Sequence, residues 1–221
     1  MAPGTLYIVA TPIGNLQDIT LRAIETLKSV NLIAAEDTRH TKILLDRYEI
    51  KTQTTSYFEY NKIQKTDYLL SLLKEGSSIA LVSDAGTPGI SDPGWKIIHM
   101  CIESAIPVVP IPGPSGLVTA LTISGKPTDK FTYEGFLSPK PIKRKNQLAK
   151  LREEGRTVVL YESPHRILKL MQDILEVYGD VEVVIARELT KKFEEVMRQK
   201  ASALVEHFTT TKPRGEFIVI V

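Results

Sequence analysis

The stretch Leu81–Gly94, LVSDAGTPGISDPG, joins an apolar run to a loop that is rich in residues with special backbone properties. Its last eleven residues contain three glycines, two prolines and two aspartates, whereas an ordinary turn needs only about two or three such residues. The run at residues 78–84 predicts a buried strand, so the loop starts at the carboxyl end of that strand. Ligands of open α/β sheets bind beyond the carboxyl ends of the strands. The stretch therefore predicts an α/β fold with a ligand-binding loop at this point.

Two further loops of the same kind follow strand-like runs. Ala10–Asn15, ATPIGN, ends the run Thr5–Thr11, and Ile111–Gly116, IPGPSG, follows Pro107–Ile111. Glycine lets the backbone approach a ligand closely, and proline holds a loop in one conformation. Such loops present main-chain N–H and C=O groups in fixed positions, which suits an adenosine or an amino-acid group.

The rest of the first half alternates strand-like and helix-like segments, which predicts a mostly parallel sheet with helices on its faces. In the first half we expect further strands at residues 32–36 and 52–58 and helices at 18–31, 41–49, 62–76, 95–104 and 119–124. In the second half we expect strands at residues 131–137, 156–162, 181–190 and 215–221, with helices between them in the basic segment, before Tyr178 and at 202–208.

The segment Gly125–Lys130, GKPTDK, combines glycine, proline and charge and is the best candidate linker. We therefore predict two α/β domains, residues 1–125 and 126–221. A cleft between two such domains is a favoured place for a ligand, and we expect the ligand there.

The composition is that of an ordinary globular protein, with 221 residues, 43% hydrophobic residues and a net charge of +2. Its apolar runs are far shorter than the roughly 20 residues that cross a bilayer, and no secretory leader is evident at the N-terminus. We expect a cytoplasmic protein without a membrane partner. Cys101 is a lone cysteine in a helical pattern, where a buried structural role is expected.

No common cofactor fingerprint is present. Neither G-x-G-x-x-G nor G-x-x-x-x-G-K-[ST] occurs, so a nicotinamide site and a P-loop are not supported. The four histidines are scattered, and we predict no metal site; His40 and His165 follow predicted strands and are the two that suit a cleft. Asp84, Thr87 and Ser115 lie in the strand-end loops, where each has two possible roles: a ligand contact, or a hydrogen bond to the local backbone.

Positive charge is concentrated between Lys140 and Arg156, where seven basic residues accompany two acidic ones. A basic stretch of this kind is either a solvated helix face or a surface for a polyanionic substrate. The sequence pattern leaves both alternatives open.

Taken together, the motifs VATPIGNL, AAEDTRHT, SDAGTPGISDPG, PGPSG, YESPHR and RELTK…RGE resemble the ribosomal RNA small-subunit methyltransferase I family of the tetrapyrrole-methylase superfamily. The matching motifs extend from Tyr7 to the last strand and occur in the family's order. Porphyrin and corrin methylases carry a G-x-G-x-G-D stretch in the first loop; ATPIGN stands in its place here, which favours the RNA branch.

The resemblance implies S-adenosylmethionine as methyl donor and 2′-O-methylation of a cytidine ribose in the decoding region of small-subunit (16S) ribosomal RNA. It also implies a fold of two α/β domains that bind the donor between them, and a homodimer. The partner would be the RNA itself or the 30S subunit. The donor contacts implied are Ala10, Asp84, Ala85, Gly86, Thr87, Pro88 and Ser115 in the first domain, and Tyr161, Ala186 and Gly215 in the second.

A ribose hydroxyl is a weak nucleophile, so a neighbouring base or cation would assist its attack. Carboxylates at or after predicted strands are the candidates for the base, and we expect the EDTR and ESPHR motifs to contact RNA: the catalytic candidates are Glu36, Asp37, Glu162 and Arg166, with Glu188 as a further carboxylate. The expected RNA contacts are Arg39, His40, Lys140, Lys143, Arg144, Lys145, His165, Arg187 and Lys191.

Two other functions compete with this one. A methylase of a small molecule such as a tetrapyrrole would not depend on RNA. A non-catalytic RNA-binding or nucleotide-binding module would bind RNA without turning over a methyl donor, and would leave the elaborate strand-end loops without a purpose.

Overall fold

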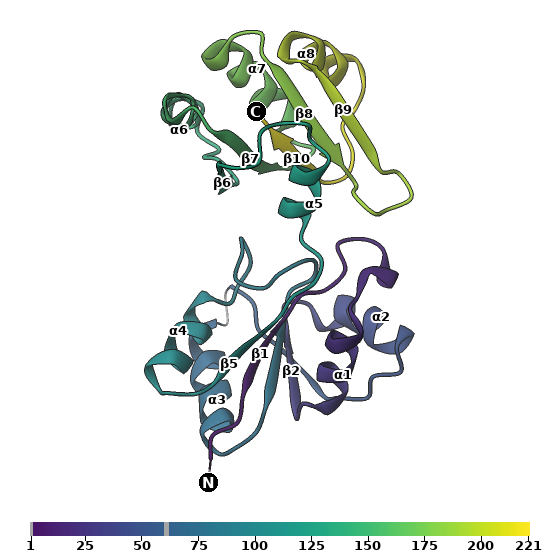
Figure 1. Cartoon of the computed structure of the whole chain (residues 1–221), viewed down its shortest axis with the longest axis vertical. Helices are drawn as coiled ribbons and strands as arrows, with labels where there is room; N and C mark the ends of the chain where they lie inside the picture. Colours follow the sequence, from purple (N-terminus) through teal and green to yellow (C-terminus); the bar gives the residue numbers. More distant parts are fainter. Residues whose placement is uncertain (1, 60–61) are drawn as a thin grey trace. The chain divides into compact units, whose positions relative to one another are not determined.

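A computed structural model describes residues 2–59 and 62–221 of the chain. These residues divide into two compact units, Met1–Ser115 and Gly116–Val221 (Figure 1). The sequence placed the division after Gly125; it falls earlier because helix α5, Gly116–Thr122, packs on strand β10 of the second unit. A Cβ atom on Gly116 would lie 3.1 Å from Ile218 of that strand.

The first unit contains a parallel sheet, as its sequence pattern predicts. In the described residues the strand order is β3-β2-β4-β1-β5, and all four pairings are parallel. The central strand β4 is buried at all four positions, in agreement with its uninterrupted apolar sequence. The strands are β1 (Leu6–Val9), β2 (Leu32–Ala35), β3 (Thr54–Ser56), β4 (Ile79–Val82) and β5 (Val108–Ile111).

Helices cover both faces of this sheet, with α1 and α2 on one side and α3 and α4 on the other (Figure 1). Alternate strand residues separate the two hydrophobic cores: Ile33 and Ala35 pack toward α1 and α2, and Ala34 packs toward α3 and α4. The helical segments are η1 (Leu16–Asp18), α1 (Leu21–Ser29), α2 (Thr38–Arg47), α3 (Lys62–Lys74) and α4 (Trp95–Glu103). Cys101 lies buried in α4, as expected.

The second unit contains a mixed sheet in the order β6-β7-β10-β8-β9. Only the β6–β7 pairing is parallel among the described strands; the other three are antiparallel. The strands are β6 (Phe131–Gly135), β7 (Thr157–Glu162), β8 (Glu182–Arg187), β9 (Glu195–Lys200) and β10 (Phe217–Ile220). Helices α6 (Pro141–Glu154), α7 (Ile167–Tyr178) and α8 (Ala201–Thr210) complete the unit, and a single hydrophobic core contains residues of all three.

Two features of the second unit were not predicted from the sequence. Strand β9 was not predicted, because among its residues only Met197 is buried and the others are mostly charged or polar. The pairing within this sheet, which the sequence pattern did not specify, is mainly antiparallel, because β8 and β9 are antiparallel neighbours and β10 enters between β7 and β8. In the described part of the chain, no helix is both long enough and apolar enough to cross a membrane.

Candidate functional site

The three glycine- and proline-rich loops of the first unit meet at the carboxyl ends of β1, β4 and β5. Thr11 and Gly86 exchange two backbone hydrogen bonds, of 2.9 and 3.0 Å, which join the first loop to the second. The Ala10 N–H donates to the Ile111 carbonyl at 3.2 Å, and the Thr87 hydroxyl donates to the Pro114 carbonyl at 3.4 Å. The loops that the sequence singled out separately therefore form one structure.

Gly86 permits these hydrogen bonds between the loops because of its backbone conformation. Its φ of +81° is a conformation that side chains with a Cβ rarely adopt. An added Cβ would lie 3.6 Å from the Ile13 side chain and 3.9 Å from the Pro114 carbonyl, which is ordinary van der Waals contact. The requirement for glycine here therefore comes from the backbone conformation and not from a lack of space.

Three carboxylates gather beside these loops. The Asp84 carboxylate accepts a hydrogen bond from the Asp37 N–H at 3.0 Å, and the Asp84 N–H donates to Glu36 at 3.5 Å. Burial raises the pKa of Glu36, and repulsion from Asp84 adds to the increase. Burial, with repulsion from Glu36 and Asp84, also raises the pKa of Asp92 to about 6, against a hydrogen bond from Ser83 that lowers it.

Asp92 was not identified from the sequence. It belongs to the same loop as Asp84, and the repeated Ser-Asp pair in SDAGTPGISDPG was the available signal. Although three carboxylates are close together, no group of three or more His, Cys, Asp or Glu residues in the described chain is arranged to hold a metal ion.

The raised pKa of Asp92 predicts a stability that depends on pH. The folded state holds the Asp92 proton more tightly than the unfolded chain, whose pKa is near 3.8, so ionisation between pH 3.8 and about 6 destabilises the fold. We expect Asp92→Asn, which keeps an acceptor for Ser83, to be more stable than the parent at pH 7.5. This advantage should shrink as the pH falls below about 6 and disappear below about 4.

Urea unfolding at a series of pH values, followed by tryptophan fluorescence, measures this difference. Trp95 is the one tryptophan of the sequence, and it starts the helix that follows the Asp92 loop. Asp18→Asn, at an exposed aspartate of the same unit, is the matched control for the loss of one carboxylate, and its stability is measured at the same pH values. An advantage of Asp92→Asn that does not vary with pH would contradict the prediction.

The EDTR motif forms the start of α2. The Asp37 carboxylate caps the helix by accepting from the Arg39 N–H at 2.8 Å, and it also forms a 2.9 Å ion pair with the Arg39 side chain. Hydrogen bonds from Arg39 lower the pKa of Asp37 to about 2. Asp37 is therefore poorly suited to accept a proton, whereas Glu36 has the raised pKa of a better acceptor. Arg39 and His40 are both exposed.

The ESPHR motif places a carboxylate in the interior of the second unit. Glu162 is 2% exposed, and burial raises its pKa. The guanidinium of Arg166 lies 3.3 Å from Glu162 and donates to the Leu137 carbonyl at 2.6 Å. These contacts favour a positioning role for Glu162 and Arg166, while His165 is exposed.

Two of the predicted donor contacts of the second unit, Tyr161 and Ala186, lie in one row of its sheet. Ile218 of β10 is paired with Tyr161 of β7 on one side and with Ala186 of β8 on the other. The Tyr161 ring also packs edge-to-face on Phe136, with centroids 5.9 Å apart. Gly215, just before β10, has a φ of +87°, and a Cβ atom there would come within 2.5 Å of Glu188.

The sequence-based expectation that Arg144 contacts RNA from a basic surface is wrong. It is 3% exposed and forms a 2.6 Å ion pair with Asp173 of α7, so it is not available to RNA phosphates. Arg144 is buried because it lies on the same face of α6 as the buried residues Leu148 and Leu151. Lys140 and Lys143 are exposed, as a phosphate contact requires.

The other basic residues are held by carboxylates. Lys145 lies 2.5 Å from Glu176, and Arg187 lies 2.9 Å from Glu195. Lys191 contacts Glu188 at 3.0 Å and Glu216 at 2.8 Å. Ion pairs of this kind at the surface contribute about 0–1 kcal/mol, so an RNA phosphate can compete for these cations.

Comparison with known proteins agrees with the α/β fold described above. Residues 5–205 match the family model described as Tetrapyrrole (Corrin/Porphyrin) Methylases. A protein of Synechocystis named ribosomal RNA small subunit methyltransferase I is 49% identical over 219 residues, which is 99% of this chain and 78% of the relative. The protein of the same name from Thermotoga maritima is 49% identical over 218 residues, which is 99% of this chain and 98% of the relative.

Solved structures share the fold at low sequence identity. A diphthine synthase superposes with a TM-score of 0.76 at 14% identity, over 99% of this chain and 90% of its own. The cobalt precorrin-4 methyltransferase CbiF superposes with a TM-score of 0.75 at 16% identity, over 98% of this chain and 94% of its own. The predicted tetrapyrrole-methylase-like α/β fold is thus confirmed.

Proposed function

The chain belongs to the ribosomal RNA small subunit methyltransferase I family within the tetrapyrrole methylases, and we propose that it transfers a methyl group from S-adenosylmethionine to the 2′-oxygen of a cytidine ribose in small-subunit ribosomal RNA. The observation that carries the proposal is the joint between the three strand-end loops, present in a chain about half identical to named ribosomal RNA methyltransferases. The small-molecule alternative has weaker support, because the tetrapyrrole-methylating structure is only 16% identical and indicates the fold alone.

The loops of the first unit fit the proposed donor. Backbone hydrogen bonds hold the first and second loops together at Thr11 and Gly86, and Gly86 takes a positive φ that glycine readily adopts. Asp84 offers a carboxylate for a hydroxyl or an ammonium group, and Ala10, Ala85, Thr87, Pro88 and Ser115 lie in the loops around it. In the second unit, Tyr161, Ala186 and Gly215 complete the proposed set of donor contacts.

S-adenosylmethionine supplies a methyl group that its sulfonium has already activated for in-line displacement. The tasks left to the chain are to align the acceptor oxygen and to receive its proton. We assign the proton to a carboxylate oxygen of Glu36, because burial and Asp84 raise its pKa while Arg39 holds the pKa of Asp37 low. Glu162, enclosed in the second unit, keeps Arg166 in place.

The direct test is methyl transfer with labelled donor to unmodified 30S subunits and, separately, to free small-subunit RNA. We expect label on a cytidine 2′-oxygen, which makes the adjacent phosphodiester resistant to alkali. Donor binding with no transfer to either RNA would move the proposal to a small-molecule acceptor. Absence of donor binding in titration calorimetry would overturn both enzymatic functions.

Lys140 and Lys143 are the proposed phosphate contacts at the start of α6, where both are exposed. Because each phosphate contact releases counterions, we expect the double change to Ala to lower the slope of log affinity against log salt by about 2. RNA binding measured at several salt concentrations tests this. Lys169→Ala, at an exposed lysine of α7, is the control and should leave the slope unchanged. Equal slopes for the parent and the double variant would contradict the assignment.

We also propose that the protein works as a homodimer in the cytoplasm, in keeping with the family. Sedimentation equilibrium of the purified chain gives the oligomeric state directly, and a monomer at all concentrations would exclude the dimer.

A further inference from the structure

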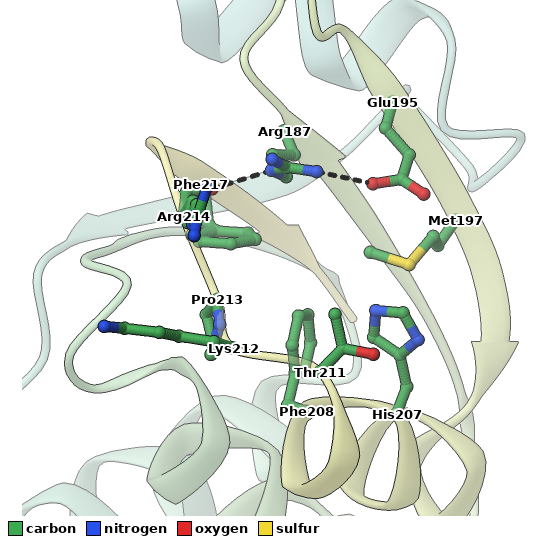
Figure 2. Close-up of a pocket in the computed structure, with 10 residues that line it drawn as sticks. All are labelled: Arg187, Glu195, Met197, His207, Phe208, Thr211, Lys212, Pro213, Arg214 and Phe217. Carbon is green, nitrogen blue, oxygen red and sulfur yellow. Dashed lines mark hydrogen bonds and ion pairs between the residues drawn. The ribbon is translucent and has the colours of Figure 1, made fainter.

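The second unit contains a cavity of about 350 Å³ that none of the proposed donor contacts lines. It lies between the β8–β9 pair, the end of α8 and the segment that leads into β10 (Figure 2). Small-molecule sites typically occupy about 300–1,000 Å³, so this cavity has room for one nucleotide-sized group.

Apolar side chains from three elements form the floor of the cavity. They are Met197 of β9, Phe208 of α8 and Phe217 of β10. Phe208 and Phe217 pack edge-to-face with their centroids 5.7 Å apart, and all three side chains are less than a tenth exposed. The floor is therefore fixed by the hydrophobic core and does not need to rearrange around a ligand.

The rim of the cavity is cationic. Arg187 is held in place by two contacts, a 2.9 Å bond to Glu195 and a 2.7 Å bond to the Arg214 carbonyl (Figure 2). Lys212 and Arg214 line the cavity and are exposed, and neither forms an ion pair within the part of the chain that the structure describes. In Figure 2 the Lys212 side chain points away from Met197 and Phe208. Both positive charges are therefore accessible to solvent at the edge of the cavity rather than at its floor.

This combination suits one chemical class of ligand. A small anion would need the cations but not the apolar floor, and an apolar molecule would need the floor but not the cations. A nucleotide uses both, because its base is flat and largely apolar while its phosphate is anionic. In a polynucleotide the backbone must leave the pocket, which requires the cations to lie at the mouth.

From this arrangement we infer that the cavity receives one nucleotide of the RNA substrate, with the base against Met197 and Phe208 and the phosphate beside Lys212 and Arg214. The inference rests on the proposed function, in that it assumes an RNA substrate. It adds a second RNA-contacting site to the nucleotide that is methylated. Arg187 and Glu195 provide a donor and an acceptor for the edge of the base.

The first experiment detects a nucleotide without any enzymatic reaction. In the full chain labelled with ¹³C-methyl methionine, Met197 reports on the cavity, while Met100 and Met171 are internal controls in other parts of the core. The Met197 signal is identified as the one that is absent from the spectrum of the Met197→Leu variant. We expect cytidine monophosphate to shift the Met197 signal in a saturable manner, and cytidine to do so more weakly. No shift, or an equal shift with inorganic phosphate alone, would overturn the inference.

The second experiment uses RNA. We expect Lys212→Ala to reduce the affinity for free small-subunit RNA about tenfold at 0.1 M salt and to lower the salt slope by about 1, with donor affinity unchanged. The matched control is Lys169→Ala, an exposed lysine on α7 outside the cavity. If both variants bind RNA alike while the parent methylates it, the cavity assignment fails and the proposed function stands. If the parent methylates no RNA but the Met197 shift persists, the proposed function is the one that fails.

Discussion

Asp84→Ala is expected to abolish measurable binding of S-adenosylmethionine, with a loss of affinity of at least about 100-fold, or roughly 2.8 kcal/mol. The carboxylate sits at the end of β4 and is the proposed contact for a polar group of the donor. It also accepts the Asp37 N–H at 3.0 Å and so holds the start of α2 against the donor loops. Titration calorimetry with the donor measures the loss, and methyl transfer should fall with it.

Asp84→Asn separates these two roles. Its amide oxygen can still accept the Asp37 N–H, so a purely structural role predicts that Asn restores donor binding, whereas a direct contact with the donor predicts that it does not. Asp46→Ala, at an exposed aspartate of α2, is the control and should bind the donor normally. RNA binding should survive in each variant, which shows that the chain is folded. Parent-like donor affinity in Asp84→Ala would remove this loop from the proposed site.

Arg144→Met should destabilise the second unit by about 3 kcal/mol, because it removes the close partner of the buried Asp173 and leaves Lys145, whose ammonium is 3.9 Å from that carboxylate. The two side chains are 3% and 9% exposed and 2.6 Å apart. Arg144 also donates to the carbonyls of Ser138 and Pro139, so it ties the segment before α6 to the helix. Urea unfolding followed by circular dichroism measures the change, and the fluorescence of Trp95 in the first unit provides an internal reference.

The double variant Arg144→Met with Asp173→Leu tests the cause. Replacing a buried ion pair by apolar residues is often neutral or stabilising, so the double variant should recover most of the lost stability. Lys143→Met is the matched control at the neighbouring exposed position and should leave stability unchanged while weakening RNA binding. If Arg144→Met were as stable as the parent and instead altered the salt dependence of RNA binding, Arg144 would be a surface residue after all.

The sequence was sufficient for the first unit but not for the second. Uninterrupted apolar runs such as Ile79–Val82, each followed by a helix, determine a parallel sheet, and the structure confirms it. Strand β9 has one buried side chain in six residues and so lacks the alternation that marks a strand. The antiparallel pairing of β10 depends on contacts between segments far apart in the chain, which no local pattern reveals.

The candidate site, too, could be predicted only in part from the sequence. Glycine and proline in SDAGTPG mark a loop by their own backbone properties, so the three loops could be found from the sequence. Burial of a charge cannot be found in this way: Arg144 looks like its neighbours Lys143 and Lys145 until Asp173, on another helix, is placed beside it. The raised pKa of Asp92 likewise depends on its burial and on Glu36, which comes from a segment far away in the sequence.

The outermost strands of both sheets are unfit to continue those sheets into another molecule. In the first sheet, β3 has only three residues, and β5 carries Pro110, which has no N–H to donate. In the second, β6 is interrupted by an irregularity between Tyr133 and Gly135, and β9 presents Arg198 and Lys200. Edge-to-edge pairing between copies of this chain is therefore disfavoured at all four sheet edges of the described residues.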